Sequence, residues 1–303
     1  MQSQAVEEQK PVHVHHPANP IMNVLLGDAL QPTQFTATSR FVVENEHQKV
    51  LMTLKKSEVV EITYENGTYT VRGPQETIVA KLPVQVTPLR GGKVVKILNF
   101  ENRPAWNTTL NDNIFFHTVK VIYSASSNRT LLVNEIGLER YVSGIAETGG
   151  ETNLSYVQAL LTAARTYALY NIEHCTKFPG QPYCLDATAN SQVYKGAGYT
   201  HRAPLVVQAQ LATRGMVITY DSEPIIAPYF SHSDGRTRSW SEVWNGDYPW
   251  AVSVADPCCS GETLYGHGVG LSGEGARYFA DLGWGWKKIL KYYYTGVKIT
   301  SRY

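Results

Sequence analysis

The chain has 303 residues, of which 43% are hydrophobic and only 17% are charged, which excludes disorder over most of its length. The formal net charge of +1 excludes a general basic field for nucleic acid, so we expect no nucleic-acid partner. No apolar run reaches the roughly 18 residues of a membrane-spanning helix.

Residues 1–20 are polar and contain three prolines, which predicts a flexible lead-in. His13, His15 and His16 lie in this segment, which is too short and mobile to favour a metal site. The start lacks the apolar core of a signal peptide. Either the protein is cytoplasmic, or a leader or anchor is missing from this sequence.

Residues 21–100 predict a small β-rich module that serves as a scaffold, because β-branched stretches alternate with turn signals. Glu65-Asn66-Gly67 between two such stretches predicts a two-residue hairpin. A second β run covers residues 115–146, with a turn at Ser126-Ser127-Asn128.

The clearest helix is predicted from Ser155 to near Glu173. Ser155 with Gln158 three residues later matches a capping box, and apolar residues follow at helical spacing. Alanines near its middle would let another element pack close to its backbone.

After this helix the pattern becomes mixed. Residues 175–203 are loop-like, a short helix follows, and a hairpin turn is predicted at Asp221-Ser222. A glycine-rich loop and two short helices end the chain. The fold class predicted is α+β: a β-rich module (21–100), then a mixed α/β catalytic core (101–303) with one central helix and two short C-terminal helices.

Cysteine and aromatic content leave alternatives open. Cys175 and Cys184 could close a short disulfide loop, whereas the adjacent Cys258 and Cys259 can hardly bridge each other without strain. An even number of cysteines fits an oxidising compartment weakly. Nineteen tyrosines and six tryptophans fit either β-rich packing or a groove whose aromatic faces stack on sugars.

One acid stands out in the loop "IAETGGET". Ile145 and Ala146 offer Glu147 an apolar setting that would hold a carboxyl group neutral, as a general acid requires. Gly149 and Gly150 would let the chain approach a ligand. Taken locally, Glu147 also fits a surface acid, and Glu151 competes with it.

Four separated blocks carry a family resemblance. They are "NEIGLERYVSGIAE", "ALLTAARTYALY", "YFSHSDGRTRSWSEVWNGDYPWAVSVADP" and "GHGVGLSGEGA". In this order they resemble the stage II sporulation protein D family, which includes amidase enhancers. The resemblance implies a peptidoglycan lytic transglycosylase that cuts between N-acetylmuramic acid and N-acetylglucosamine, often in strands whose peptides an amidase has removed.

The resemblance also implies site residues. The family's catalytic glutamate precedes the arginine of the AARTYA block by eighteen residues, which selects Glu147 relative to Arg165. Arg165, Tyr229, Ser231 and His267 are the implied substrate-binding residues. For Arg165 a purely structural salt bridge is the alternative. Tyr167 fits core packing better than a groove wall.

Two departures stand out. Gln158 replaces the family's usual lysine, and Gly273 replaces a usual glutamine. Some members hold zinc after the AARTYA helix, where this chain offers His174, Cys175 and Cys184. A structural zinc site requires four ligands, and this segment offers three. We therefore expect no cofactor and favour a disulfide.

Three functions follow. The first is a lytic transglycosylase, for which Glu147 alone suffices because the muramic acid 6-hydroxyl can attack its own anomeric carbon. The alternative is a non-catalytic peptidoglycan-binding enhancer of a cell-wall amidase. A cytoplasmic sugar-modifying enzyme comes third. The expected partners are glycan strands and a wall amidase, at an extracytoplasmic location.

Overall fold

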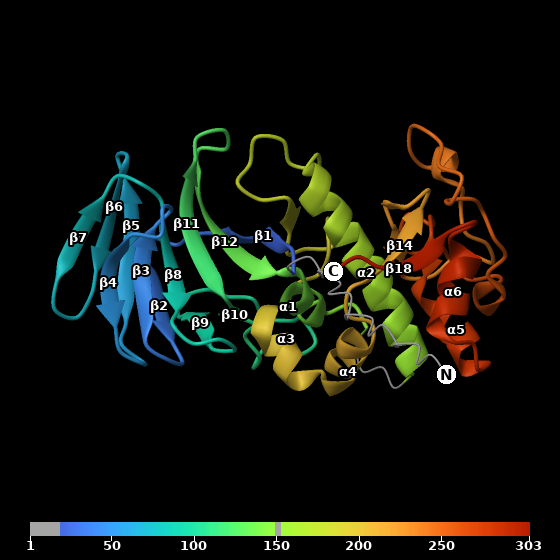
Figure 1. Ribbon diagram of the computed structural model, residues 1–303, viewed down its shortest axis with the longest axis horizontal. Coiled ribbons are helices and arrows are strands. Elements are labelled where there is room, and N and C mark those ends of the chain that lie inside the picture. The colour runs from blue at the N-terminus through green and yellow to red at the C-terminus, as the bar shows by residue number, and fades with distance from the viewer. Residues whose placement is uncertain (1–18, 149–152) are drawn as a thin grey trace, which may run out of the picture.

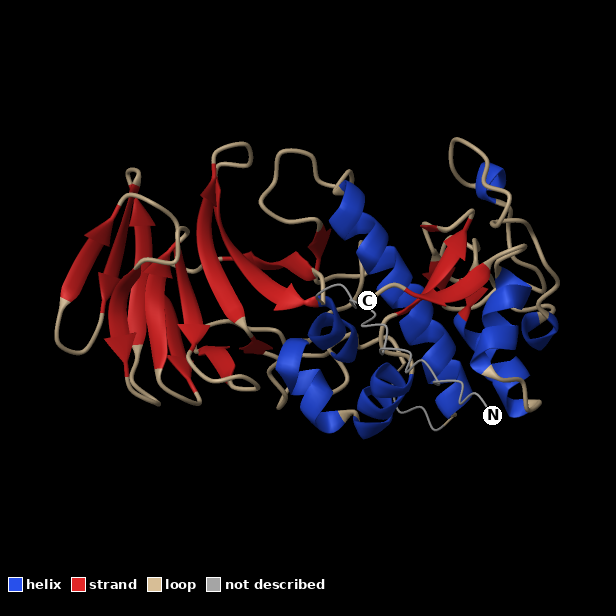
Figure 2. Cartoon of the chain, in the orientation of Figure 1, coloured by secondary structure: helices blue, strands red, loops and turns tan. Residues whose placement is uncertain are grey.

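The computed structural model describes residues 19–148 and 153–303, and it confirms the α+β class. The molecule is elongated, with β-strands gathered at one end and helices at the other (Figures 1 and 2). The long helix α2 (Leu154–His174) crosses the region between them. The predicted lead-in, with its three histidines, lies almost wholly outside the described residues.

Two antiparallel sheets form the β-rich end. The larger has the order β13-β1-β12-β11-β8-β3-β4 and the smaller has the order β10-β9-β2-β5-β6-β7, with β13 joining β1 in parallel. The larger sheet consists of β1 (Ile21–Asp28), β3 (Phe41–Asn45), β4 (Val50–Leu54), β8 (Val84–Pro88), β11 (Thr118–Ser124), β12 (Arg129–Gly137) and β13 (Leu185–Asp186). The smaller consists of β2 (Thr33–Ala37), β5 (Val60–Glu65), β6 (Thr68–Arg72), β7 (Thr77–Ala80), β9 (Val94–Ile97) and β10 (Ile114–Phe116).

Alternating side chains explain why these strands form sheets with one buried face. In β2, Thr33, Phe35 and Ala37 are buried while the residues between them are half-buried. The hairpin at Asn66-Gly67 is confirmed: both residues have positive φ, as such a turn requires.

Both sheets combine strands from either side of residue 100. In the larger, β11 and β12 pair with β8 and β1, and in the smaller, β10 pairs with β9. The sheets therefore run across the predicted boundary between module and core. Whether the two segments fold independently stays a prediction, because strand pairing does not measure it.

The second half is built from helices and short strands. The remaining helices are α1 (Leu138–Ser143), α3 (Gly196–Arg202), α4 (Pro204–Ala212), α5 (Gly273–Asp281) and α6 (Trp286–Tyr293), with single 3-10 turns η1 (Trp240–Glu242) and η2 (Pro257–Cys259). The remaining strands are β14 (Met216–Tyr220), β15 (Glu223–Pro224), β16 (Tyr229–Phe230), β17 (Leu271–Ser272) and β18 (Lys298–Ser301). The hairpin at Asp221-Ser222 and the two C-terminal helices are confirmed.

Two helices differ from the sequence prediction. Helix α1 occupies the end of the run that was predicted as β. Its β-branched and aromatic residues favour a strand, but in the structure they are buried on a helix. Helix α3 forms in the segment read as a loop, despite two glycines within it. None of the helices in the described part of the chain is long and apolar enough to cross a bilayer.

Helix α2 begins one residue earlier than predicted and has a different cap. The side chain of Asn153 accepts hydrogen bonds from the backbone N–H groups of Ser155 (3.0 Å) and Tyr156 (3.4 Å), so the predicted capping box is wrong. The helix ends at His174, one residue beyond the prediction. Its small residues are fully buried, as the alanine pattern predicted; they include Ala159, Ala163, Ala164 and Ala168.

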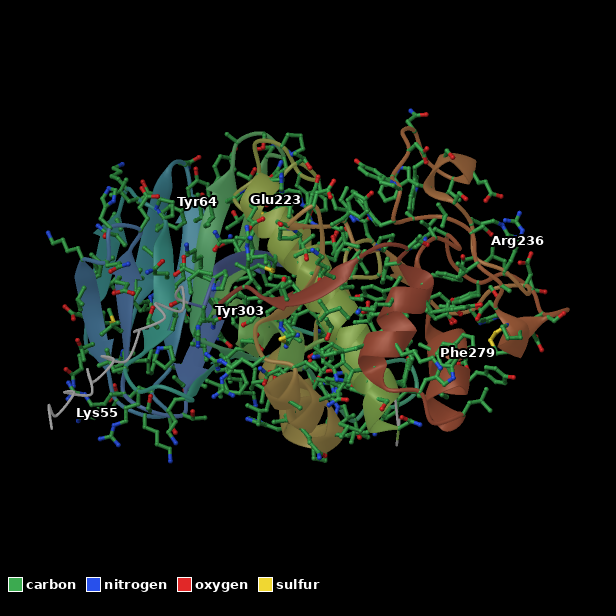
Figure 3. The ribbon with its side chains drawn as sticks, turned by 45° about the vertical axis from the view of Figure 1, so that its right-hand side comes forward. Lys55, Tyr64, Glu223, Arg236, Phe279 and Tyr303 are labelled. Carbon is green, nitrogen blue, oxygen red and sulfur yellow. A yellow bond between two sulfur atoms is a disulfide. The ribbon has the colours of Figure 1, made fainter. Side chains whose placement is uncertain are left out.

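A buried ion pair joins α2 to α1. Arg165 is 0% exposed, and its Nε and Nη2 donate to the two carboxylate oxygens of Glu139 at 2.9 and 3.1 Å. Glu139 also accepts from the backbone N–H of Gly215 (2.9 Å), from the Gln210 amide and from the hydroxyl of Tyr303 (2.8 Å). Tyr303 lies near the centre of the molecule (Figure 3).

This arrangement lowers the pKa of Glu139 overall. Burial alone would raise that pKa, but the charge and hydrogen bonds of Arg165, helped by Gly215 and Gln210, outweigh it. The pair therefore stays ionised at neutral pH, with every charge bonded.

We expect Arg165→Met to lower the free energy of unfolding by about 3–5 kcal/mol, because Glu139 would be left as an uncompensated buried charge. Urea denaturation followed by circular dichroism measures this. The matched control is Arg72→Met, which removes a solvent-exposed pair with Glu61 (3.6 Å) and is expected to cost about 0–1 kcal/mol. Equal losses for the two variants would contradict the anchoring role of Arg165.

Candidate active site

A cleft of about 800 Å³ lies between α2, the segment around Glu147, the loop after β16 and the glycine-rich loop before β17. Aromatic side chains line much of it, as a sugar-binding groove would require. They include Tyr156, Tyr167, Tyr170, Tyr229, Phe230, Trp240, Trp244 and Tyr265. Tyr167, which the sequence assigned to packing, thus contributes to both the core and the groove wall.

The carboxyl group of Glu147 lies in this cleft, partly buried, and both of its oxygens accept hydrogen bonds. Oε1 accepts from the backbone N–H of Val193 at 2.8 Å, and Oε2 accepts from the hydroxyl of Tyr229. Glu147 is therefore held from two sides by segments far from it in the sequence.

Backbone pairing brings Glu147 to Val193. The N–H of Ala146 donates to the Val193 carbonyl, and the N–H of Lys195 donates to the Gly144 carbonyl, each at 2.8 Å. These bonds flank the antiparallel bridge between Ile145 and Tyr194. The chain leaving α1 is thereby fixed against residues 193–195 before it reaches the glutamate.

A buried glutamine sets the direction of the Tyr229 hydroxyl. Gln192 is 0% exposed, and its amide nitrogen donates to the Tyr229 hydroxyl (3.0 Å) and to the Ala164 carbonyl (3.1 Å). Its amide oxygen accepts from Tyr141 (2.9 Å). Because an amide nitrogen only donates, the single proton of Tyr229 is directed to Glu147.

The pKa of Glu147 is raised to about 7. Burial is the largest cause, since it disfavours the charged carboxylate, while the hydrogen bonds from Tyr229 and Val193 work in the opposite direction. A carboxyl group with a pKa near neutrality can give up a proton and take one back at similar cost, which suits general acid–base catalysis.

The glycine-rich loop reaches the cleft through a short parallel pairing. Strand β16 pairs with β17, so that Tyr229 lies opposite Leu271. Gly270 has a φ of 79°, and a Cβ there would overlap the Pro228 carbonyl oxygen. Glycine is therefore required where the two segments meet.

His267 lines the cleft as the resemblance implied, with its ring 4.8 Å from that of Trp244. Burial lowers its pKa to about 4, while a hydrogen bond with the Tyr229 backbone works against the shift. Its Nδ1 accepts from the backbone N–H of Val269 (3.1 Å). The ring is neutral at pH 7, so it does not act as an acid there. Its hydrogen bond instead holds the backbone of Tyr229.

Ser231 also lines the cleft, and its side chain is exposed there. Its carbonyl accepts from the backbone N–H of Glu274 at 3.0 Å, which ties it to the first turn of α5. Of the two departures from the family pattern, Gly273 lines the cleft and Gln158 does not. Glu151, with Gly149 and Gly150, lies outside the described residues.

Arg165 is the correction among the predicted substrate-binding residues. Its guanidinium group is fully buried, pairs with Glu139 and does not line the cleft. A group without access to a ligand cannot bind one, so the structural alternative fits Arg165. The residue that the eighteen-residue spacing selects, Glu147, does line the cleft, although Arg165 itself does not.

The cysteines form two disulfides. Cys175 bonds to Cys184, as favoured, so two of the three candidate zinc ligands are not thiolates in this structure. The third, His174, is exposed, and its ring stacks on Tyr170 at 4.1 Å.

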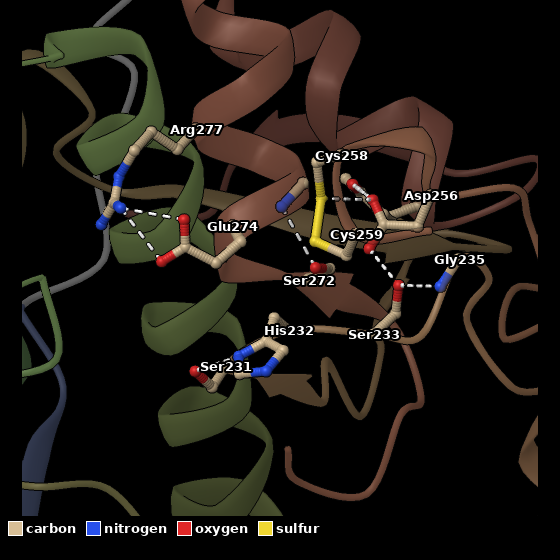
Figure 4. The surroundings of a disulfide bond; sticks show 12 residues. Ser231, His232, Ser233, Gly235, Asp256, Cys258, Cys259, Ser272, Glu274 and Arg277 are labelled. Carbon is tan, nitrogen blue, oxygen red and sulfur yellow. Dashed lines mark hydrogen bonds and ion pairs between the residues drawn. A yellow bond between two sulfur atoms is a disulfide. The ribbon is translucent and has the colours of Figure 1, made fainter. Parts of the chain in front are cut away.

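Cys258 bonds to the adjacent Cys259, so the expectation that they would not bridge each other is wrong. With the other two cysteines paired, each of these has only its neighbour. Figure 4 shows this disulfide beside Asp256, whose carboxylate accepts from Ser233 (2.8 Å) and Tyr293 (2.7 Å).

Sequence reasoning missed Gln192 and Val193. Both lie in "TANSQVY", within the segment 175–203 that the sequence predicts to be loop-like. The sequence around a glutamine does not show whether its side chain will be buried. The one available signal was that Gln192 directly precedes two apolar residues, Val193 and Tyr194.

We expect Tyr229→Phe to raise the pKa of Glu147 above its value of about 7, because the variant removes a donor to the charged carboxylate. A hydrogen bond to a charged group is worth about 1.5–3 kcal/mol, which corresponds to roughly one to two pH units. Carbon-13 NMR titration of the glutamate carboxyl groups measures this. Tyr278→Phe, outside the cleft, should leave the value unchanged; an unchanged value in Tyr229→Phe would contradict the assignment.

Comparison with known proteins finds relatives of the region that carries the site. Residues 126–220, which include Glu147, Arg165 and Gln192, match the family SpoIID, described as Stage II sporulation protein. The stage II sporulation protein D of Bacillus amyloliquefaciens is 30% identical over 137 residues, covering 41% of this chain and 40% of that protein. The protein of the same name from Bacillus subtilis (strain 168) is 28% identical over 137 residues, with the same coverage.

An uncharacterized protein of Brachyspira hyodysenteriae is 33% identical over 136 residues, covering 44% of this chain and 35% of that protein. The matches thus span well under half the length of these relatives. They confirm the resemblance that the four sequence blocks predicted: this chain is similar to the stage II sporulation protein D family over the region that carries the candidate acid.

Proposed function

We propose that the protein is a peptidoglycan lytic transglycosylase that cuts glycan strands between N-acetylmuramic acid and N-acetylglucosamine. The observation that carries the proposal is Glu147, a partly buried carboxyl group with a pKa of about 7 in an aromatic-lined cleft. The similarity to stage II sporulation proteins supports a sporulation-related, cell-wall-related role.

The chemistry needs one carboxyl group. Protonated Glu147 gives its proton to the glycosidic oxygen, and the bond from that oxygen to the anomeric carbon breaks. The 6-hydroxyl of the muramic acid then attacks the anomeric carbon and passes its proton to Glu147. The products are a 1,6-anhydro ring and a free sugar end. The proton balance closes without water, so no second carboxylate has to activate one.

The surroundings of Glu147 fit both steps. Val193 and Tyr229 each donate to one carboxylate oxygen, and these bonds stabilise the anion that forms when the acid has given up its proton. Because a carboxylate has about four lone-pair positions and these bonds use two, there is room for the transferable proton.

The location and partners belong to the same proposal. Peptidoglycan lies outside the cytoplasmic membrane, and two disulfides support an oxidising compartment. A wall amidase would supply strands without peptides. If the protein only binds glycan and stimulates such an amidase, both effects should survive the loss of Glu147.

The decisive experiment is digestion of amidase-treated peptidoglycan followed by mass spectrometry. Wild type should release anhydro-muramoyl products, and Glu147→Gln should lower their rate by roughly 10²–10⁴-fold, because an amide cannot donate the proton. Glu262→Gln, an exposed residue outside the cleft, is the matched control and should match wild type.

Two outcomes would contradict the proposal. One is the absence of anhydro product from wild type, and the other is equal product from Glu147→Gln. Glu274→Gln adds a test of mechanism, because Glu274 is a second carboxylate in the cleft. If Glu274 were equally essential and the product carried an added water, a two-carboxylate hydrolysis would replace the mechanism above.

The pH dependence follows from the pKa of Glu147. The protonated form is active, so kcat/KM should be level below about pH 7 and fall tenfold per pH unit above it. In Tyr229→Phe the fall should begin at higher pH, since the pKa rises. Initial rates across pH 5–9 measure both curves, and an activity that rises through pH 7 would contradict the role of Glu147 as the acid.

A further inference from the structure

Lys177 places a positive charge in the wall of the cleft. It lies in the loop closed by the Cys175–Cys184 disulfide, it lines the cleft, and it is half-buried. Its ammonium group donates to the backbone carbonyl of Asn190 and to the hydroxyl of Tyr167 (3.4 Å). An ammonium group has three N–H donors, so one remains for a ligand.

This charge has no ion-pair partner among the described residues, since the carboxylates there all lie beyond 4 Å of the Lys177 nitrogen. Asp186 acts on it at longer range. However, the Asp186 oxygens accept from Thr188 (2.9 and 2.6 Å) and Asn190 (2.7 Å), which builds the turn that carries the Asn190 carbonyl.

The other basic side chain that lines the cleft makes the contrast clear. Arg277 also lines it, but Arg277 pairs with Glu274 at 2.9 Å. Burial lowers the pKa of Lys177, which means that its surroundings disfavour the charged amine. A half-buried ammonium group without a paired carboxylate is stabilised when an anion binds beside it.

Lys177 and Glu147 act on the same tyrosine. The hydroxyl of Tyr167 accepts from Lys177, and burial, followed by the charges of Asp186 and Glu147, raises the pKa of Tyr167 to about 12. The cation and the candidate acid therefore lie within electrostatic reach of one side chain. Both groups also line the same cleft, so one ligand can meet both of them.

We propose that Lys177 binds the carboxylate of the lactyl group of N-acetylmuramic acid and thereby favours strands without peptides. The inference rests on the proposed function. In a glycan strand without peptides, each muramic acid carries this one negative charge. When a stem peptide is attached, the same carboxyl group is a neutral amide, so it offers Lys177 no charge.

The test compares two substrates that differ in this charge and by one methyl group: peptide-free glycan, and the same glycan with its lactyl carboxylates converted to methyl esters. Wild type should prefer the free acid by on the order of tenfold, as expected for one partly buried charge pair. Lys177→Met should bring that ratio close to one, and Lys177→Arg should restore most of it. The ratio is independent of how much active protein each preparation contains.

Lys120→Met is the matched control. Lys120 is also half-buried, but its amine pairs with Glu135 outside the cleft. This variant should keep the wild-type ratio. A wild type that cleaves both substrates equally, or a Lys177→Met variant that keeps the preference, would overturn the inference while leaving the proposed function intact.

Binding separates the two proposals. The same substrates are titrated against Glu147→Gln protein, with and without Lys177→Met, by isothermal calorimetry. If the free acid binds more tightly than the ester and Lys177→Met removes the difference, the carboxylate site is supported. This holds even if wild type cleaves neither glycan, a result that would contradict the proposed function alone. Equal binding of acid and ester overturns the carboxylate site.

Discussion

The buried pair of Arg165 and Glu139 is the interaction on which the second half of the molecule depends. It joins the central helix to α1, and through Gly215 and Tyr303 it also holds the start of β14 and the end of the chain. The segment with the candidate acid leaves α1 directly. Removing the arginine would therefore loosen the element that aims the carboxyl group, although the arginine itself does not reach the cleft.

The acidity of Glu147 results from opposing contributions that come from different parts of the chain. Burial raises its pKa, and donors from residues 193 and 229 limit the rise. Gln192 directs the hydroxyl of Tyr229, and His267 makes a hydrogen bond with the backbone of the same tyrosine. Because these groups come from segments far apart in the sequence, a carboxyl group that titrates near neutrality is a property of the assembled core.

Local chemistry explains which features the sequence predicted. Asn66-Gly67 and the end of α2 were predictable because turn residues and helical periodicity act over a few positions. The role of Arg165 was not, since a guanidinium group on a helix looks the same whether its partner is a ligand or Glu139. Gln192 was missed because its importance comes from three partners distant in sequence. Helix α1 was missed because burial outweighed β propensity.

The amide of Gln192 also blocks the transfer of protons away from Glu147 through Tyr229. Hydroxyl and imidazole groups can pass a proton along a chain, whereas a neutral amide donates without releasing one. Behind Glu147, the described partners are a backbone N–H and a tyrosine backed by this amide. Among the described residues, the hydroxyl of Tyr229 is thus the one group behind the carboxyl that could carry a proton, and the Gln192 amide ends that path. Under the proposed function, a glycan that fills the cleft would itself supply the proton that returns to the glutamate.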